Sequence, residues 1–197
     1  MDLDTPHGPA HVTLDEPASG PLSLLVLGHG AGGGVDAPDL LAVRRAALAA
    51  GVAVARVTQP YRLAGRRSPA PAPQLDAAWK AVVEALRRPG VPLVVGGRSS
   101  GARVACRTAT AAGAVGVVAL AFPLHPPGRP ERSRAGELVS GVPTLVVNGD
   151  RDPFGVPPAD GIDLRVIPGA THDLRAGLPA VAQAVTGWLA SHGWARA

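Results

Sequence analysis

The sequence predicts an α/β fold in three layers, with a mostly parallel β-sheet covered by helices on both faces. Apolar runs alternate with Ala- and Leu-rich segments of helical length along the whole chain. The apolar runs are continuous, which is typical of parallel strands buried on both faces. Of the 197 residues, 46% are hydrophobic but only 3% are aromatic, so the core is expected to consist of Val, Leu and Ala. No repeat or linker divides the chain, and we expect a single domain over residues 1–197.

The expected strands are the apolar or alternating runs His11–Asp15, Leu22–Leu27, Val52–Val57, Val91–Val95, Val115–Leu120, Pro143–Val147 and Asp163–Ile167. The expected helices are Pro38–Ala50, Gln74–Arg88, Ser99–Ala112 and the amphipathic segment Leu178–Ser191. Proline-rich stretches at Thr58–Pro73 and Pro123–Pro130 are expected to be loops, the second followed by a weakly helical segment.

The charge pattern argues against nucleic-acid binding. The formal net charge is +4, and Lys80 is the only lysine, so almost every base is an arginine. These arginines are scattered along the chain, no nucleic-acid-binding motif is present, and few aromatic side chains are available to stack on bases.

Cysteine content and hydropathy favour a cytoplasmic protein. Cys106 is the only cysteine, which excludes an internal disulfide and fits a reducing compartment. No apolar stretch is long enough to span a bilayer, and Met1–Pro9 lacks the apolar core of a signal peptide. We therefore expect no membrane association.

The segment Gly97-Arg98-Ser99-Ser100-Gly101 matches the G-x-S-x-G pattern at a predicted junction of strand and helix. A serine on such a sharp turn adopts a strained backbone, and side chains two positions away on either side would collide, so glycine is needed at both. Ser99 is the candidate nucleophile, because centring the pattern on Ser100 removes the flanking glycines. The alternative is a glycine turn with a serine that caps the helix.

An acid and a histidine follow two later strands. Ligands of parallel sheets bind at the carboxyl ends of the strands, so residues at these ends are expected to meet. His172 follows the last predicted strand and is the candidate base. For the acid, Asp150 and Asp152 compete, and we favour Asp152 because Pro153 ends regular structure and turns the loop over the site. Ser99, Asp152 and His172 thus occur in the chain order Ser, Asp, His.

The glycine-rich segment Gly28–Gly34 is a candidate oxyanion hole. It matches neither G-x-G-x-x-G in its full context nor the phosphate-binding G-x-x-x-x-G-K-S/T pattern. The backbone N–H groups of Ala31 and Ser100 are expected to converge on the developing oxyanion. A flexible turn is the alternative.

Four further residues are candidate substrate contacts. Arg66 and Arg67 lie in a proline-stiffened loop without acidic neighbours, and a guanidinium group suits a carboxylate or phosphate on a substrate. A solvated loop is the alternative. His29, in the glycine-rich segment, and His125, in the Pro123–Pro130 loop, are the other two candidates.

Together these motifs resemble the serine-hydrolase branch of the α/β-hydrolase superfamily, and its small lidless members of the dienelactone-hydrolase type in particular. The chain is similar to the group that contains the hydrolase-like domains of a testis-expressed protein and of a chromatin acetyltransferase-complex subunit. Segments 60–67 and 122–128 resemble features of that group. Dienelactone hydrolases themselves use a cysteine nucleophile, whereas this chain has Ser99, so their substrate is not carried over.

The resemblance implies an α/β-hydrolase fold without a cap domain and a Ser-His-Asp triad that cleaves small esters or thioesters through an acyl-enzyme. Such chemistry needs neither a cofactor nor a metal ion. The short segment Leu120–Gly141 leaves no room for a lid, which favours an open site. The alternative function is a non-catalytic interaction module that has kept the fold, since the group includes members regarded as scaffolds.

Overall fold

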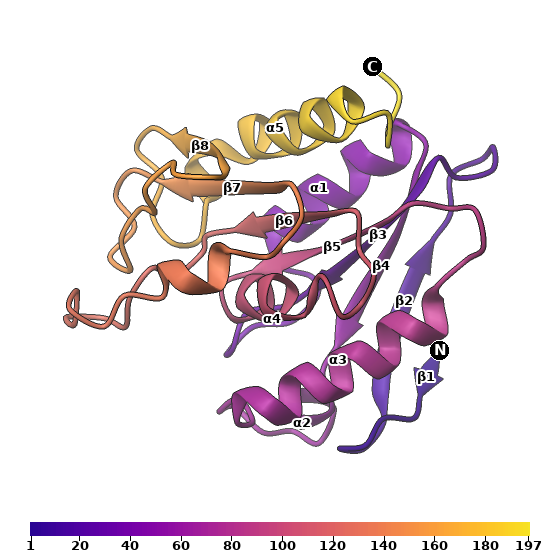
Figure 1. The fold of residues 1–197 in the computed structure, drawn as a ribbon, viewed down its shortest axis with the longest axis horizontal. Helices are drawn as coiled ribbons and strands as arrows, with labels where there is room; N and C mark the ends of the chain where they lie inside the picture. The colour runs from indigo at the N-terminus through magenta and orange to yellow at the C-terminus, as the bar shows by residue number, and fades with distance from the viewer.

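The computed structural model describes residues 1–197 and contains one eight-stranded sheet (Figure 1). Its strands are β1 (Asp2–Leu3), β2 (Ala10–Asp15), β3 (Ser23–Gly28), β4 (Val52–Thr58), β5 (Leu93–Arg98), β6 (Gly116–Leu120), β7 (Thr144–Gly149) and β8 (Asp163–Ile167). The strand order is β1-β2-β4-β3-β5-β6-β7-β8. Strand β2 pairs antiparallel with β1 and β4, and all other neighbours are parallel.

The helices form a layer on each face of this sheet (Figure 1). Helices α1 (Pro38–Ala49) and α5 (Leu178–Ser191) pack together on one face, and α3 (Ala72–Leu86) and α4 (Ser100–Thr108) on the other. Three shorter segments complete the fold: α2 (Pro60–Leu63) and the 3₁₀ helices η1 (Ala135–Leu138) and η2 (Arg175–Gly177). The predicted three-layer architecture with a mostly parallel sheet is confirmed.

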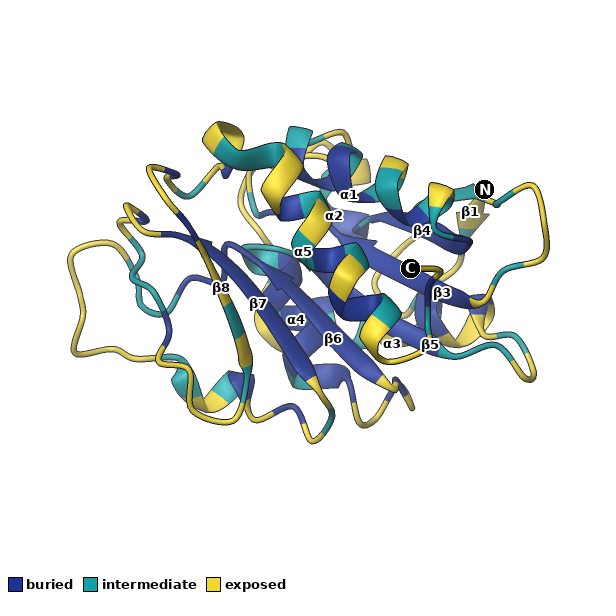
Figure 2. Ribbon diagram, turned by 90° about the horizontal axis from the view of Figure 1, so that it is seen from above, coloured by how far each residue is buried: buried dark blue, intermediate teal, exposed yellow.

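Burial on both faces explains why the central strands are continuously apolar. All six residues of β3 are buried, and side chains alternate between the two faces. Leu24 and Val26 belong to the core beneath α3 and α4, whereas Leu25 and Leu27 belong to the core beneath α1 and α5. Figure 2 shows the same contrast, with buried central strands and helices exposed on their outer faces.

The predicted boundaries differ from the structure mainly at glycine and proline. Strand β5 continues to Arg98, through the two glycines that were expected to end it. Gly96 pairs with Leu27 on β3 and Val118 on β6. It must be glycine, because a Cβ there would lie 2.5 Å from the carbonyl oxygen of Val118. The expected loop 58–73 contains α2, which begins with Pro60 at the helix start, where proline is tolerated. Helix α4 ends at Thr108, earlier than expected.

The topology brings several loops to one edge of the sheet. Strand β3 lies between β4 and β5, so the chain leaves β3 in one direction and continues from β5 in the other. Ligands bind at such switch points in parallel sheets. Gly28 at the end of β3 is in register with Gly97 near the end of β5, which brings the glycine-rich segment beside Ser99. Between β6 and β7 the chain forms loops and η1 only, so no cap domain covers this edge.

No helix in the structure has both the length and the apolar character needed to cross a bilayer.

Candidate active site

Ser99 occupies the sharp turn between β5 and α4. Its backbone lies in the left-handed region, at φ 52° and ψ −111°, which a residue with a side chain adopts only at a cost. Two backbone hydrogen bonds hold the turn: the Ser99 N–H donates to the carbonyl of Leu120 at 2.9 Å, and the Arg103 N–H donates to the carbonyl of Ser99 at 3.2 Å. The strained geometry expected from the sequence motif is present.

The flanking glycines permit a close approach between this turn and β3. A Cβ at Gly97 would lie 2.4 Å from the carbonyl oxygen of Gly28, and a Cβ at Gly101 would also lie 2.4 Å from that oxygen. Both distances are too short for any side chain. Strand β3 therefore requires glycine at both positions. The expected collision between the strand and helix of the turn is also present at Gly97, where a Cβ would lie 2.9 Å from the carbonyl carbon of Gly101.

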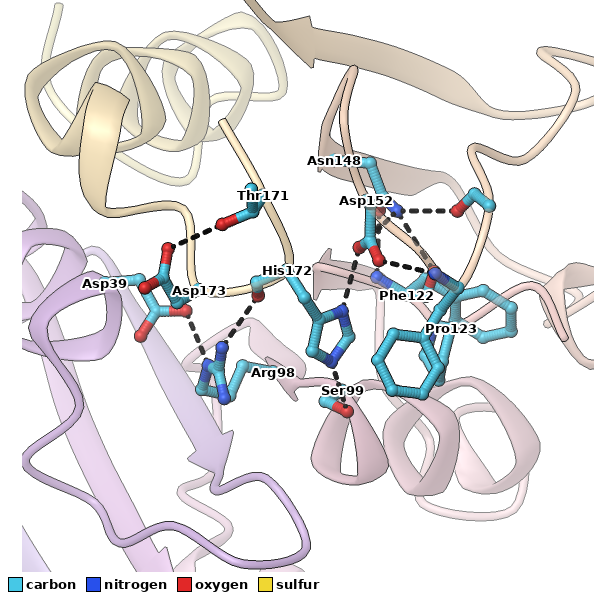
Figure 3. A network of polar contacts seen from close by, with 12 residues as sticks. Asp39, Arg98, Ser99, Phe122, Pro123, Asn148, Asp152, Thr171, His172 and Asp173 are labelled. Atoms are coloured by element: carbon cyan, nitrogen blue, oxygen red, sulfur yellow. Dashed lines mark hydrogen bonds and ion pairs between the residues drawn. The ribbon is translucent and has the colours of Figure 1, made fainter. Parts of the chain in front are cut away.

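His172 lies in the turn after β8 and reaches Ser99 (Figure 3). Its Nε2 atom lies 2.9 Å from Oγ of Ser99, and its Nδ1 atom lies 2.8 Å from Oδ2 of Asp152. The ring of Phe154 packs against the imidazole, with 4.2 Å between ring centroids. A serine, a histidine and a carboxylate from the ends of three strands thus form one continuous hydrogen-bonded chain.

Asp152 is fixed by several donors besides His172. Its side chain is fully buried, and the backbone N–H of Phe154 donates to Oδ1 at 2.9 Å. The amide of Asn148 lies 3.4 Å from Oδ2 and also donates to the carbonyls of Phe122 and Gly155. These contacts fix the carboxylate relative to the sheet, as Figure 3 shows.

The side chain of Asp150 does not contact His172. Its Oδ1 atom accepts the backbone N–H of Gly169 at 2.8 Å, and the residue is exposed. The structure thus brings Asp152, and not Asp150, into contact with His172.

Two backbone N–H groups near Ser99 have no acceptor in the protein. Ser100 is the first residue of α4, where an N–H has no intrahelical partner. The N–H of Ala31 makes no hydrogen bond with the protein either. The hydroxyl of Tyr61 donates to the carbonyl of Ala31 at 2.8 Å and so holds the glycine-rich segment in place. Burial raises the pKa of Tyr61 to about 12, so this hydroxyl remains a donor at neutral pH.

His29 does not meet the expectation of a substrate contact. Its ring is buried, and its Nε2 atom accepts the backbone N–H of Gln59 at 3.1 Å. The proton therefore resides on Nδ1, which donates to the carbonyl of Gly30 at 2.8 Å. Burial lowers the pKa of His29, which favours this neutral form. Both nitrogens are thus used in supporting the glycine-rich segment.

Arg66 and Arg67 are exposed and form no ion pair, and no contact joins them to Ser99 or His172. Arg66 lines a small hollow beside Tyr61 and His7. His125 lies closer to the site: its backbone N–H donates to the carbonyl of Phe154, and a Cβ at Gly155 would lie 2.7 Å from its Nε2 atom. His125 thus packs against the loop that carries Asp152.

Cys106 lies within α4 and is buried. Burial raises the pKa of its thiol to about 12, so the reactive thiolate does not form at neutral pH. The side chain packs in the core.

Arg98 was not predicted from the sequence as a functional candidate. This residue precedes Ser99, and its guanidinium donates from Nε to Oδ2 of Asp39 and from Nη2 to the backbone carbonyl of His172, both at 2.8 Å (Figure 3). Asn148, Phe154 and Tyr61 were missed as well. Arg98 and Tyr61 have partners that are distant in sequence, so no local pattern identifies them. Asn148 and Phe154, in contrast, lie four and two residues from Asp152, which they contact.

A protein-family model described as an alpha/beta hydrolase domain matches residues 21–177. The chain belongs to the α/β-hydrolase family. Solved structures with the fold of this α/β-hydrolase include the following three. A lidless α/β serine hydrolase from Xanthomonas campestris is 23% identical with a TM-score of 0.80, and the match covers 100% of this chain and 94% of that one.

Est1E from Butyrivibrio proteoclasticus, solved with bound ferulic acid, is 20% identical to this α/β-hydrolase with a TM-score of 0.77, over 97% of this chain and 98% of that one. A dienelactone hydrolase from Anabaena variabilis is 18% identical with a TM-score of 0.75, over 100% and 97% of the two chains. At these identities the likeness establishes the fold alone. No curated protein sequence matches this α/β-hydrolase.

Proposed function

We propose that this α/β-hydrolase cleaves small esters or thioesters through an acyl-enzyme on Ser99. The observation that supports the proposal most directly is the chain of hydrogen bonds from Asp152 through His172 to Ser99, at 2.8 Å and 2.9 Å. A serine hydroxyl is a weak nucleophile until a neutral imidazole removes its proton, and His172 is within hydrogen-bonding distance to do so.

In the proposed acylation, Oγ of Ser99 attacks the substrate carbonyl carbon while its proton moves to Nε2 of His172. The carbonyl oxygen becomes an oxyanion, and the N–H groups of Ala31 and Ser100 stabilise it. Collapse of this intermediate breaks the bond to the alcohol or thiol, which takes the proton from Nε2. Water then attacks the acyl-enzyme, with the same nitrogen as base, and releases the acid and Ser99.

Asp152 fixes the tautomer of His172 that this sequence requires. Because its carboxylate only accepts hydrogen bonds, Nδ1 of His172 carries the proton and Nε2 is left free to act as base. The buried carboxylate also stabilises the imidazolium that forms during each step.

The absence of a cap domain favours small substrates or acyl groups that project into solvent. Segments 60–67, which include α2, and 122–128 follow strands β4 and β6 at this open edge. Their resemblance to the testis-expressed and acetyltransferase-complex group supports a place for the chain near that group. Arg66 and Arg67 are exposed and do not contact the residues of the proposed machinery, so their role in holding a carboxylate or phosphate of the substrate stays a prediction.

Labelling with a fluorophosphonate probe tests the proposal, with intact-protein mass spectrometry as the readout. We expect one probe per wild-type chain, none on Ser99→Ala, and full labelling of Ser100→Ala, whose backbone N–H is retained. Hydrolysis of short p-nitrophenyl esters and thioesters should fall on the order of a million-fold in Ser99→Ala or His172→Ala. A wild-type chain that is neither labelled nor active would favour the interaction module.

A further inference from the structure

Arg98 connects three elements that meet at the candidate active site. It ends β5, its Nε atom donates to Asp39 in the first turn of α1, and its Nη2 atom donates to the backbone carbonyl of His172 after β8. Figure 3 shows the guanidinium between these two partners. Only 15% of the Arg98 side chain is exposed, so it is packed in place.

Asp39 fixes the guanidinium from the helix side. Its side chain is 1% exposed, and Arg98 is the only cation that it contacts. Its other oxygen, Oδ1, accepts the backbone N–H of Leu40 at 3.0 Å, and the start of a helix favours a negative charge. A buried carboxylate without a partner is strongly unfavourable, so Arg98 and Asp39 hold one another in position.

The contact with His172 is the only hydrogen bond that the backbone of His172 makes. Its ring is held by Ser99 and Asp152, but its backbone N–H has no acceptor and its carbonyl accepts from Arg98 alone. The backbone position of the base therefore depends on the guanidinium that precedes the nucleophile.

We propose that Arg98 is a positioning residue that sets the distance and angle between His172 and Ser99, with Asp39 as its anchor. This inference rests on the proposed function. Arginine suits the role because it presents separate N–H donors to acceptors on two different elements, whereas lysine has a single nitrogen for both. The guanidinium also leaves little space for a side chain at position 30, because a Cβ at Gly30 would lie 3.0 Å from Nη1 of Arg98.

Steady-state kinetics of Arg98→Lys test the proposal. We expect kcat for a short p-nitrophenyl ester to fall roughly 100-fold, as a misplacement near 1 Å does, with KM changed less than about twofold. The rate of fluorophosphonate labelling should fall in parallel with kcat. Arg103→Lys is the matched control, because Arg103 forms a comparable two-nitrogen pair with Glu137, at 2.8 Å and 2.6 Å, without contacting Asp152, His172 or the Ser99 side chain.

If the unpaired carboxylate of Asp39 prevents an Arg98 variant from folding, the double variant Arg98→Met/Asp39→Asn tests the proposal, because it removes that charge as well. Its kcat should fall at least as far as the roughly 100-fold expected for Arg98→Lys, because the carbonyl of His172 has lost its only donor. If the folded Arg98 variants keep the wild-type kcat and labelling rate, the positioning role is wrong and Arg98 only stabilises the fold.

The proton NMR resonance of Nδ1–H in His172 provides a readout that does not require activity. We expect it to broaden in Arg98→Lys and to remain unchanged in Arg103→Lys. An unchanged resonance in Arg98→Lys would overturn the positioning role whether or not the wild-type chain hydrolyses esters. A broadened resonance in Arg98→Lys, together with a wild-type chain that the probe does not label, would instead reject the proposed function and retain the link between Arg98 and His172.

Discussion

The Oδ2 atom of Asp152 lies 2.8 Å from Nδ1 of His172. The carboxylate of Asp150, only two residues earlier, accepts the N–H of Gly169 instead. The two acids of the turn after β7 therefore have different partners. Asp152 holds the imidazole of His172, and Asp150 holds the separate turn that follows β8.

Asp152→Asn is expected to lower kcat by about ten-thousand-fold, because an amide facing Nδ1 permits the tautomer with its proton on Nε2. Asp150→Asn is expected to keep kcat within a few fold and to lower Tm by no more than about 4 °C, since at most one exposed hydrogen bond is weakened. Ester hydrolysis and thermal unfolding of both variants check this. The opposite order of activities would assign the acid to Asp150.

Tyr61→Phe is expected to lower kcat roughly ten-fold, less than the 100- to 1,000-fold cost of removing an oxyanion donor outright. The ring stays in its buried place, but the carbonyl of Ala31 loses its hydrogen bond, so the glycine-rich segment becomes less ordered. KM should change little. Equal kcat in Tyr61→Phe and wild type would show that the segment holds its conformation without this contact.

His29 should make stability fall as the pH drops below about 6.5. Its folded-state pKa is lowered by burial, whereas an unfolded histidine titrates near ~6.5. As the pH falls below ~6.5, the unfolded chain takes up a proton first, and stability falls by at most about 1.4 kcal/mol per pH unit.

Denaturant unfolding from pH 8 to pH 5 measures this slope. His29→Gln should have a flatter profile over the same range, whatever its absolute stability. His7→Gln, at an exposed position, is the control and should leave the slope unchanged. A wild-type slope in His29→Gln would mean that other groups cause the pH dependence.

Cys106 should not react with 5,5′-dithiobis(2-nitrobenzoic acid) in the folded protein at neutral pH. Burial and a pKa of about 12 keep its thiol protonated and inaccessible. One equivalent should react after unfolding in guanidinium chloride. Ser133→Cys, which adds a cysteine at an exposed position, should react at once in the folded state. Rapid reaction of the folded wild-type chain would place Cys106 in a segment that opens easily.

The parallel sheet and the meeting of Ser99, Asp152 and His172 could be predicted because both follow from rules of topology. Continuous apolar runs indicate strands buried on both faces, and parallel strands bring the residues after them to one edge. The structure places the three residues there, at the ends of β5, β7 and β8. Their catalytic roles remain a prediction.

The contacts of Arg98, His29 and Tyr61 could not be predicted, because they join residues that are distant in sequence. Arg98 contacts Asp39, 59 residues away, and His172, 74 residues away. His29 was expected to face a substrate, but the backbone of Gln59 occupies one ring nitrogen, and no local pattern reveals that contact. Gly96 was expected to end a strand, since glycine disfavours strands, yet the neighbouring strand leaves no space for a side chain there.

The left-handed backbone of Ser99 has a consequence for attempts to make this protein more heat-resistant. Such a conformation costs a residue with a side chain on the order of 1–3 kcal/mol, whereas glycine adopts it without that strain. Selection for thermal tolerance alone would favour glycine at position 99, and selection for turnover would keep serine. A library screened only for survival on heating is therefore expected to accumulate inactive, more stable chains, so residue 99 should be held fixed from the first round.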